Sequence, residues 1–311
     1  MLKSSRREFL VEASAVAAAC TVGGSLAGQA ERSAAAMAVA KWGGDQPSSS
    51  DEIERVAEQL TVKAVEGIGG IGKFVRRGDV VWVKPNIAWI QPPEMAANTN
   101  PKVVATIVRL CFEAGAKRVK VGDNPVDIAQ QTYEISKIAA AVRPLGADVV
   151  FMDRSRFRRV GIKGEVLKEI PIYPEILEAD LVINVPIAKH HGLATITVAM
   201  KNFMGVVEER RTFHQAIGPT LTDLCLFLKP KLTVVDAVRV LVARGPRGGR
   251  LEDVRTPLAV AAGTDVVALD AWAAELLGRN PDEISSVVCG DKAGLGTKDY
   301  RSLNPVEISL A

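Results

Sequence analysis

The chain has 311 residues, of which 48% are hydrophobic and 24% are charged, and its formal net charge is +3. This composition is typical of a globular protein with a sizeable core. So small a charge excess argues against a nucleic-acid partner or a partner on a membrane surface. Aromatic residues make up only 5% while Gly, Ala and Val are plentiful, which favours an α/β architecture over a β-sandwich.

The first thirty residues have the layout of an export signal. A basic start is followed by an Ala-rich, mildly apolar stretch, which Glu12 interrupts, and then by small residues. This stretch is too weakly hydrophobic to span a bilayer. Within it, Ser5-Arg6-Arg7-Glu8-Phe9-Leu10 matches the twin-arginine consensus. We therefore expect residues 1–30 to be a signal peptide that engages the twin-arginine translocase, with the mature protein in the periplasm or another extracytoplasmic compartment.

Two details of this segment bear on the mature protein. Cleavage is expected after Ala27 or Ala30, where small residues precede the cut. Lipidation at Cys20 is the weaker alternative, because Ala17 stands where Leu is usual. The twin-arginine route carries folded proteins, often with a cofactor already inserted, but the sequence does not identify a cofactor.

The other three cysteines, Cys111, Cys225 and Cys289, stand far apart in the sequence. There is no CxxC spacing, so neither an iron–sulfur cluster nor a structural zinc is predicted from local thiolates. No later segment is long and apolar enough to predict an integral membrane span.

Beyond the signal, residues 31–51 are small and polar and predict a flexible leader to a domain over residues 52–311. Helical patterns then alternate with apolar strands, which predicts βαβ units and an α/β fold with a mostly parallel sheet and helices on both faces. A small antiparallel excursion is expected near 154–174, with turns at Gly161 and Gly164. The expected elements, in order, are a helix from 51, a strand at 79–86, a helix at 101–115, a strand at 118–123, a helix at 130–145, strands at 148–153 and 179–186, a helix at 219–228, strands at 231–236 and 258–261, a helix at 266–278 and a short strand at 285–290.

Polar residues recur where these strands end. Lys84 and Asn86 follow the first strand, Asp123 the second, and Asp236 a later one. Ligands bind beyond the carboxyl ends of parallel strands, so we expect these side chains to share one site. Any one of them could instead serve only as a turn former.

All three histidines of the chain lie within one short stretch: His190, His191 and His214. Pro186 and Gly192 flank the adjacent pair and predict a loop in which both side chains converge. On a strand, only one of the two could reach a site, because successive side chains point to opposite faces.

Three lysines favour an anion over a metal ion as the ligand of this site. Adjacent histidines have poor chelating spacing, and Lys84, Lys189 and Lys201 repel a cation. They suit a carboxylate or a phosphate, with a histidine left for proton transfer. Asp123 and Asp236 are candidate ligands of a divalent metal that bridges to the anion.

Several stretches resemble one known family. VWVKPNI, AGAKRVKVGDNP, EADLVINVPIAKHHGLATITVAMKNFMG, KPKLTVVDAV and GTDVVALDAWAAELLG occur in the order found in the domain of unknown function 362 (DUF 362) family. This sequence has Lys-His-His where the family usually has Lys-Thr-His, so His191 takes the place of the family histidine. Many relatives carry a ferredoxin-like module, and this chain has no such cysteine clusters. The resemblance points to Lys84, Pro85, Asn86, Lys189, His190 or His191, Lys201, Asn202, Gly205 and Asp236.

Together these features predict an enzyme that acts on a small anionic molecule. His191 and His214 are the candidate catalytic residues, with His191 in acid–base work. The reaction class is open, and metal assistance is one alternative. A second alternative is a non-catalytic ligand-binding protein or an accessory partner of a redox complex. The expected substrate-binding residues are Lys84, Asn86, Lys189, His190, Lys201 and Asn202.

Overall fold

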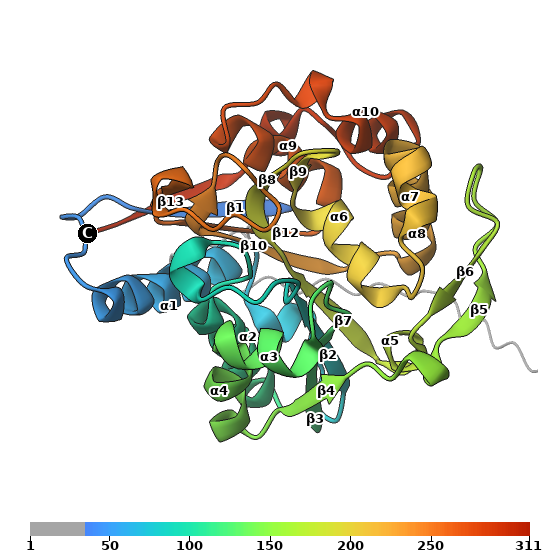
Figure 1. Cartoon of the computed structure of the whole chain (residues 1–311). Helices are drawn as coiled ribbons and strands as arrows, with labels where there is room; N and C mark the ends of the chain where they lie inside the picture. Colours follow the sequence, from blue (N-terminus) through green and yellow to red (C-terminus); the bar gives the residue numbers. More distant parts are fainter. Residues whose placement is uncertain (1–34) are drawn as a thin grey trace, which may run out of the picture. The chain divides into compact units, whose positions relative to one another are not determined.

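One mixed sheet of eleven strands organises residues 35–311, which are the residues that the computed structural model describes (Figure 1). The run from β10 to β4 along its main path is parallel, whereas β12 is antiparallel to both of its neighbours. The predicted α/β fold with a mostly parallel sheet is therefore confirmed. The main path is β13 (Val306–Leu310), β1 (Met37–Trp42), β12 (Ala259–Gly263), β10 (Leu232–Leu241), β7 (Leu181–Val185), β2 (Val80–Pro85), β3 (Arg118–Asp123) and β4 (Asp148–Phe151).

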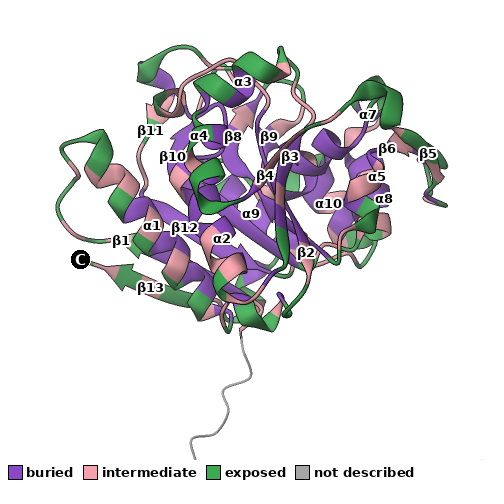
Figure 2. Ribbon diagram, turned by 90° about the horizontal axis from the view of Figure 1, so that it is seen from below, coloured by how far each residue is buried: buried purple, intermediate pink, exposed green. Residues whose placement is uncertain are grey.

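Helices cover both faces of this sheet, and each face has its own apolar core. Alternate residues of a strand enter different cores: Val39 belongs to one layer, whereas Ala38 and Ala40 belong to the other. Figure 2 shows the buried residues concentrated on the strands and on the helix sides that face them. One layer holds α1 (Ser50–Gly67), α2 (Pro101–Glu113), α3 (Ala129–Ile135) and α4 (Ile138–Val142); the other holds α6 (Ala199–Asn202), α8 (Ile217–Leu228), α9 (Val266–Leu276) and α10 (Ser285–Lys292).

The antiparallel excursion expected near 154–174 is a separate two-stranded sheet. It pairs β5 (Arg158–Gly161) with β6 (Glu169–Ile172). A short helix, α5 (Pro174–Glu178), then leads back to β7 in the main sheet.

The predicted flexible leader is wrong for part of its length. Residues 37–42 form β1, which pairs with β12 on one side and β13 on the other. Its first four residues are completely or almost completely buried. The small apolar side chains of this strand alternate between its two faces, so the strand packs into both cores. The free energy of this packing favours the strand although the surrounding sequence is small and polar. The predicted signal peptide at 1–30, including Cys20, lies outside the described residues.

Two other segments differ from the expected elements. The helix expected at 130–145 is broken at Lys137, whose φ of 59° is left-handed, so two short helices replace one. The strand expected at 285–290 is instead the start of α10, which packs closely on α8. Small residues allow that approach, because a Cβ at Gly218 would stand 2.6 Å from the Ser285 carbonyl oxygen. Within residues 35–311, no helix has both the length and the apolar character needed to cross a membrane.

Candidate functional site

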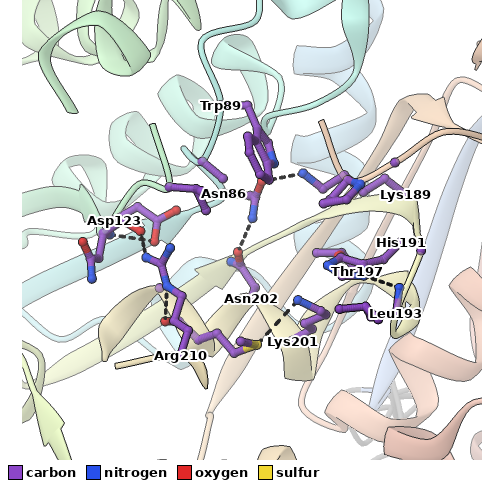
Figure 3. Close-up of a pocket in the computed structure, with 18 of the residues that line it drawn as sticks. Asn86, Trp89, Asp123, Lys189, His191, Leu193, Thr197, Lys201, Asn202 and Arg210 are labelled. Carbon is purple, nitrogen blue, oxygen red and sulfur yellow. Dashed lines mark hydrogen bonds between the residues drawn. The ribbon is translucent and has the colours of Figure 1, made fainter. Parts of the chain in front are cut away.

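A pocket of about 490 Å³ opens at the carboxyl ends of the parallel strands. Asn86 follows β2 and Asp123 ends β3, and both line this pocket. The third part of the wall is a hairpin of β8 (Ile187–His191) and β9 (Thr195–Thr197), which follows β7. The chain thus brings the strand-end residues together as expected. Figure 3 shows their side chains around the pocket.

The two adjacent histidines lie on a strand and have different surroundings. His191 lines the pocket together with Lys189, two residues before it in β8. His190 is not among the pocket residues, and its Nδ1 accepts a hydrogen bond from the Gly245 backbone N–H at 3.1 Å. The expectation of a loop that directs both histidines into one site is therefore wrong. The alternation of side chains along a strand is the physical reason.

A chain of buried polar side chains runs along the pocket wall and includes one residue beneath it. Lys189 Nζ donates to Asn86 Oδ1 at 2.9 Å. Asn86 Nδ2 and Lys84 Nζ both donate to Asn202 Oδ1, each at 3.1 Å. Lys84 Nζ also forms an ion pair with Asp123 Oδ1 at 2.7 Å. We call these five residues the polar chain.

Lys84 is fully buried inside the polar chain and does not line the pocket. Burial lowers its pKa, while Asp123 opposes that shift. The structure thus places Lys84 under the pocket, next to Asp123, rather than at its surface. Both asparagines, Asn86 and Asn202, do line the pocket.

Asp236, the second candidate metal ligand, lies elsewhere. It is on β10, and β7 and β2 separate that strand from Asp123 on β3. Its carboxylate accepts the backbone N–H of Asn100 at 2.7 Å and of Val238 at 2.9 Å. Burial raises its pKa to about 7. The two aspartates therefore form no common site, and residues 35–311 contain no group of three or more His, Cys, Asp or Glu side chains placed to hold a metal ion.

His191 is held as a neutral imidazole with its proton on Nε2. Its Nδ1 accepts the backbone N–H groups of Leu193 at 3.1 Å and Ala194 at 3.2 Å, and so carries no proton. Burial, followed by the charge of Lys201, lowers the pKa of His191 to about 3. Such a group donates a hydrogen bond through Nε2, which differs from the acid–base role expected from the sequence.

Lys201 reaches the pocket from α6, a single helical turn. Asp270 on α9 fixes the start of this turn, since its carboxylate accepts the Ala199 N–H at 2.6 Å and the Met200 N–H at 3.3 Å. The nearest polar contact of Lys201 Nζ is Met204 Sδ at 3.5 Å. No carboxylate within residues 35–311 forms a salt bridge with it. Burial, followed by the charge of Arg210, lowers the pKa of Lys201 to about 8.

Thr197 supplies a buried hydroxyl without a partner. Its side chain is 4% exposed and lines the pocket. Among the buried side-chain polar atoms of the described residues, its Oγ1 is the one that makes no hydrogen bond. Buried hydroxyls are almost always hydrogen-bonded to protein or to ordered water, so this atom is free to pair with a water or a ligand in the pocket.

Thr197, Arg210 and Trp89 are pocket residues that the sequence did not indicate. Arg210 donates to the carbonyl oxygens of Asn124, Pro125 and Met204, and burial lowers its pKa. Only its closeness to the KNFMG stretch in the sequence could have indicated it. His214, a predicted catalytic residue, is exposed on α7 (Arg211–Gln215) and still lines the pocket. The apolar part of the wall comprises Trp89, Val126, Leu193, Met204 and Pro246.

These features define an α/β protein with a cationic, partly apolar pocket at the ends of parallel strands. A family model described as "Domain of unknown function (DUF362)" matches residues 81–275, which is more than half of the chain. The chain belongs to this family, as the resemblance of its motifs indicated.

Proteins similar to this chain include a curated relative and a solved structure. One is the thylakoid-associated protein sll1697 of Synechocystis sp., 29% identical over 241 residues, which are 74% of this chain and 73% of that protein. The other is the lactate racemase apoprotein from Thermoanaerobacterium thermosaccharolyticum, a solved structure with a TM-score of 0.47 and 10% identity. That match covers 75% of this chain and 55% of the other, so this chain spans little more than half of its length. Structural similarity at this level carries no information about the function of this chain.

Proposed function

We propose that this protein is an enzyme that acts on a small carboxylate or phosphate bound in the strand-end pocket. The observation that carries the proposal is the excess of basic side chains there. Lys189, Lys201 and Arg210 line the pocket, and of the acidic side chains in residues 35–311 only Asp123 does so. Lys84 already neutralises Asp123. A bound anion would offset the remaining positive charge in surroundings where water screens it poorly.

In this proposal each pocket residue has a role that follows from the chemistry of its side chain. Lys201 and Arg210 attract the anionic group, and the neutral His191 donates a hydrogen bond from Nε2 to a substrate oxygen. Asn86 and Asn202 fix Lys189 through the polar chain. The apolar wall accommodates an uncharged body on the substrate, and His214 lies at the pocket as a group for proton transfer.

We further propose that the protein works outside the cytoplasm after export by the twin-arginine translocase. The support is the motif at residues 5–10. The relative from Synechocystis sp. is named as thylakoid-associated, which agrees with an extracytoplasmic or membrane-associated site of action. Expression of the chain with Arg6 and Arg7 both changed to Lys should leave it in the cytoplasm, and normal export of that variant would contradict the proposal.

Isothermal titration calorimetry with defined anions tests the pocket. We expect the full chain to bind 3-phenylpropionate or phenyl phosphate and to bind neutral benzyl alcohol much more weakly. Lys201→Met should reduce the affinity by roughly tenfold or more, because a buried charged hydrogen bond contributes about 1.5–3 kcal/mol. Lys117→Met, at an exposed lysine outside the pocket residues, is the matched control and should bind normally.

Catalysis and simple capture are separated by the fate of the bound molecule. Anions that bind by calorimetry are incubated with the protein, and proton NMR spectra of the ligand are followed over time. New ligand resonances that appear only in the presence of the native protein would support catalysis. Stoichiometric binding with an unchanged ligand across the whole panel would instead make the chain a ligand-binding protein.

A further inference from the structure

Lys84 and Lys189 are buried at or under the pocket and Lys201 is half-buried there, and the three ammonium groups differ in what they contact. Lys84 is paired with Asp123. Lys189 donates to Asn86 Oδ1 and to the Ala97 carbonyl, so two of its three N–H groups are used. Lys201 has only the thioether of Met204 within hydrogen-bonding range. Of the three, Lys201 is therefore the amine whose lone pair is exposed to a ligand once its proton is lost.

Two hydrogen-bonding groups accompany this amine. The Thr197 hydroxyl has no partner within the described residues, and the imidazole of His191 keeps its Nε2 proton. Figure 3 shows the side chains of Thr197, His191 and Lys201 on the same side of the pocket. A nucleophilic amine together with two neutral donors suits a polarised C=O group, whose oxygen takes up negative charge and then a proton as the amine adds.

We propose that Lys201 is a nucleophile that forms an imine with the carbonyl group of a 2-oxo acid. The inference rests on the proposed function, because the carboxylate of that acid is the anion for which the pocket provides cations. Because the reacting amine of Lys201 is neutral, Arg210 is the cation for it, and Lys189 is a neighbouring hydrogen-bond donor whose pKa burial and then the charge of Lys201 lower well below the usual value. The apolar wall favours an acid with an aliphatic or aromatic side chain.

The reaction balances without a further reactant. The neutral amine of Lys201 adds to the carbonyl carbon, and a new C–N bond replaces the C–O π bond. The oxygen takes a proton and becomes a carbinolamine hydroxyl, to which Thr197 and His191 hydrogen-bond. This hydroxyl then takes a second proton and leaves as water, while the nitrogen lone pair forms the C=N bond. The two protons come from the amine and from solvent, and the product is a protonated imine plus one water.

The amine must be neutral for this chemistry, and its surroundings favour that form. Burial and then Arg210 lower the pKa of Lys201 to about 8, whereas an exposed lysine has a pKa near 10.4. A useful fraction of the amine is thus unprotonated near neutral pH. This is one of the ways in which proteins activate lysine as a nucleophile.

Reductive trapping tests the inference. The full chain is incubated with phenylpyruvate or pyruvate and with cyanoborohydride, and is then digested and analysed by mass spectrometry. We expect a mass gain equal to the oxo acid less one oxygen atom, mapped to the peptide that contains Lys201. The rate of trapping should rise as the pH passes through about 8, where the amine loses its proton. Thr197→Val should slow trapping several-fold, and Thr197→Ser should restore it.

The controls separate this inference from the proposed function. 3-Phenylpropionate has the carboxylate but no ketone, so it should compete with phenylpyruvate and form no adduct. Anion binding without any adduct at Lys201 overturns the imine and leaves the anion site intact, whereas failure of both binding and trapping overturns both. Equal labelling of Lys201, Lys189 and surface lysines such as Lys117 also overturns the imine, because it would show ordinary amine reactivity. Lys201→Arg, which keeps the charge, should lose the adduct while a circular dichroism melt confirms its fold.

Discussion

Gly205 and Asp123 are in such close contact that a Cβ at Gly205 would overlap Oδ1 of Asp123 and stand 2.6 Å from Nζ of Lys84. The glycine therefore leaves room for the buried ion pair at one end of the polar chain. Its backbone holds the same region, because the Gly205 carbonyl accepts the Asn124 N–H at 3.0 Å.

Gly205→Ala should therefore separate Lys84 from Asp123 or push the turn at 203–206 out of place. Disruption of a buried ion pair typically costs about 3–5 kcal/mol, so we expect a loss of that order in the free energy of unfolding, measured with urea. Gly72→Ala is the matched control, since its Cβ would have no neighbour within 4 Å. It should change stability by no more than about 0.5 kcal/mol. Equal stability of the two variants would contradict the role given to Gly205.

Replacement of Thr197 by valine should change stability and ligand binding in opposite directions. An unpaired buried hydroxyl costs about 1–3 kcal/mol, and Val has nearly the same shape without that group. Thr197→Val should therefore raise the melting temperature of the ligand-free protein, while it weakens binding of an anion whose oxygen reaches Oγ1. Thr197→Ser serves as the control and should bind like the wild type. A valine variant with lower stability would indicate that the hydroxyl already has a partner.

The lowered pKa of His191 predicts a specific pH dependence of the free energy of unfolding. Its pKa is about 3 in the folded protein and about 6.5 when unfolded, so the unfolded chain binds the extra proton between these values. Its contribution to stability is thus fully present above about pH 6.5 and is lost as the pH falls towards 3. Between about pH 7.5 and 4.5, the wild type should lose more stability than His191→Gln in urea titrations. The two proteins share every carboxyl group, so a profile of equal slope would contradict the depressed pKa.

We expect Asp236 to contribute to the stability of the fold and not to metal binding. Because its pKa is raised from 3.8 to about 7, its contribution is fully present below the unfolded value and is lost as the pH rises through about 7. Asp236→Asn keeps one of the two oxygens that accept a backbone N–H and turns an amide N–H towards the other backbone N–H, so it should be less stable than the wild type even at slightly acid pH. Asp236→Ala leaves the Asn100 and Val238 N–H groups unpaired and should cost roughly 1–3 kcal/mol. Elemental analysis by mass spectrometry should give the same metal content for all three proteins, and a selective loss in the alanine variant would restore the metal hypothesis.

Much of the candidate site could be predicted from local patterns, because parallel strands end at a common edge. The strand at Val80–Pro85 predicted the positions of Lys84 and Asn86, and the next strand that of Asp123. The same rule failed for Asp236, since β10 continues for several residues beyond it and leaves it inside the sheet. Continuation of a strand depends on its neighbours, and these are distant in sequence.

The residues that the sequence did not reveal depend on tertiary contacts. Arg210 enters the pocket through backbone carbonyls of Asn124 and Pro125, which no local pattern connects to it. The helical state of α10 follows from close packing against Gly218 of α8, although its apolar residues would also suit a strand. Likewise, β1 takes its structure from strands near the other end of the chain.

The position of β1 has a consequence for how the protein is made. Residues 37–42 leave the ribosome early, whereas their partners at 259–263 and 306–310 are synthesised late. The parallel strands β2, β3, β4 and β7 can pair while translation continues, but β1 must wait for most of the chain. Until then its apolar side chains have no sheet to enter, and they are candidate binding sites for a chaperone. Completion of this sheet therefore requires strands that are synthesised long after β1.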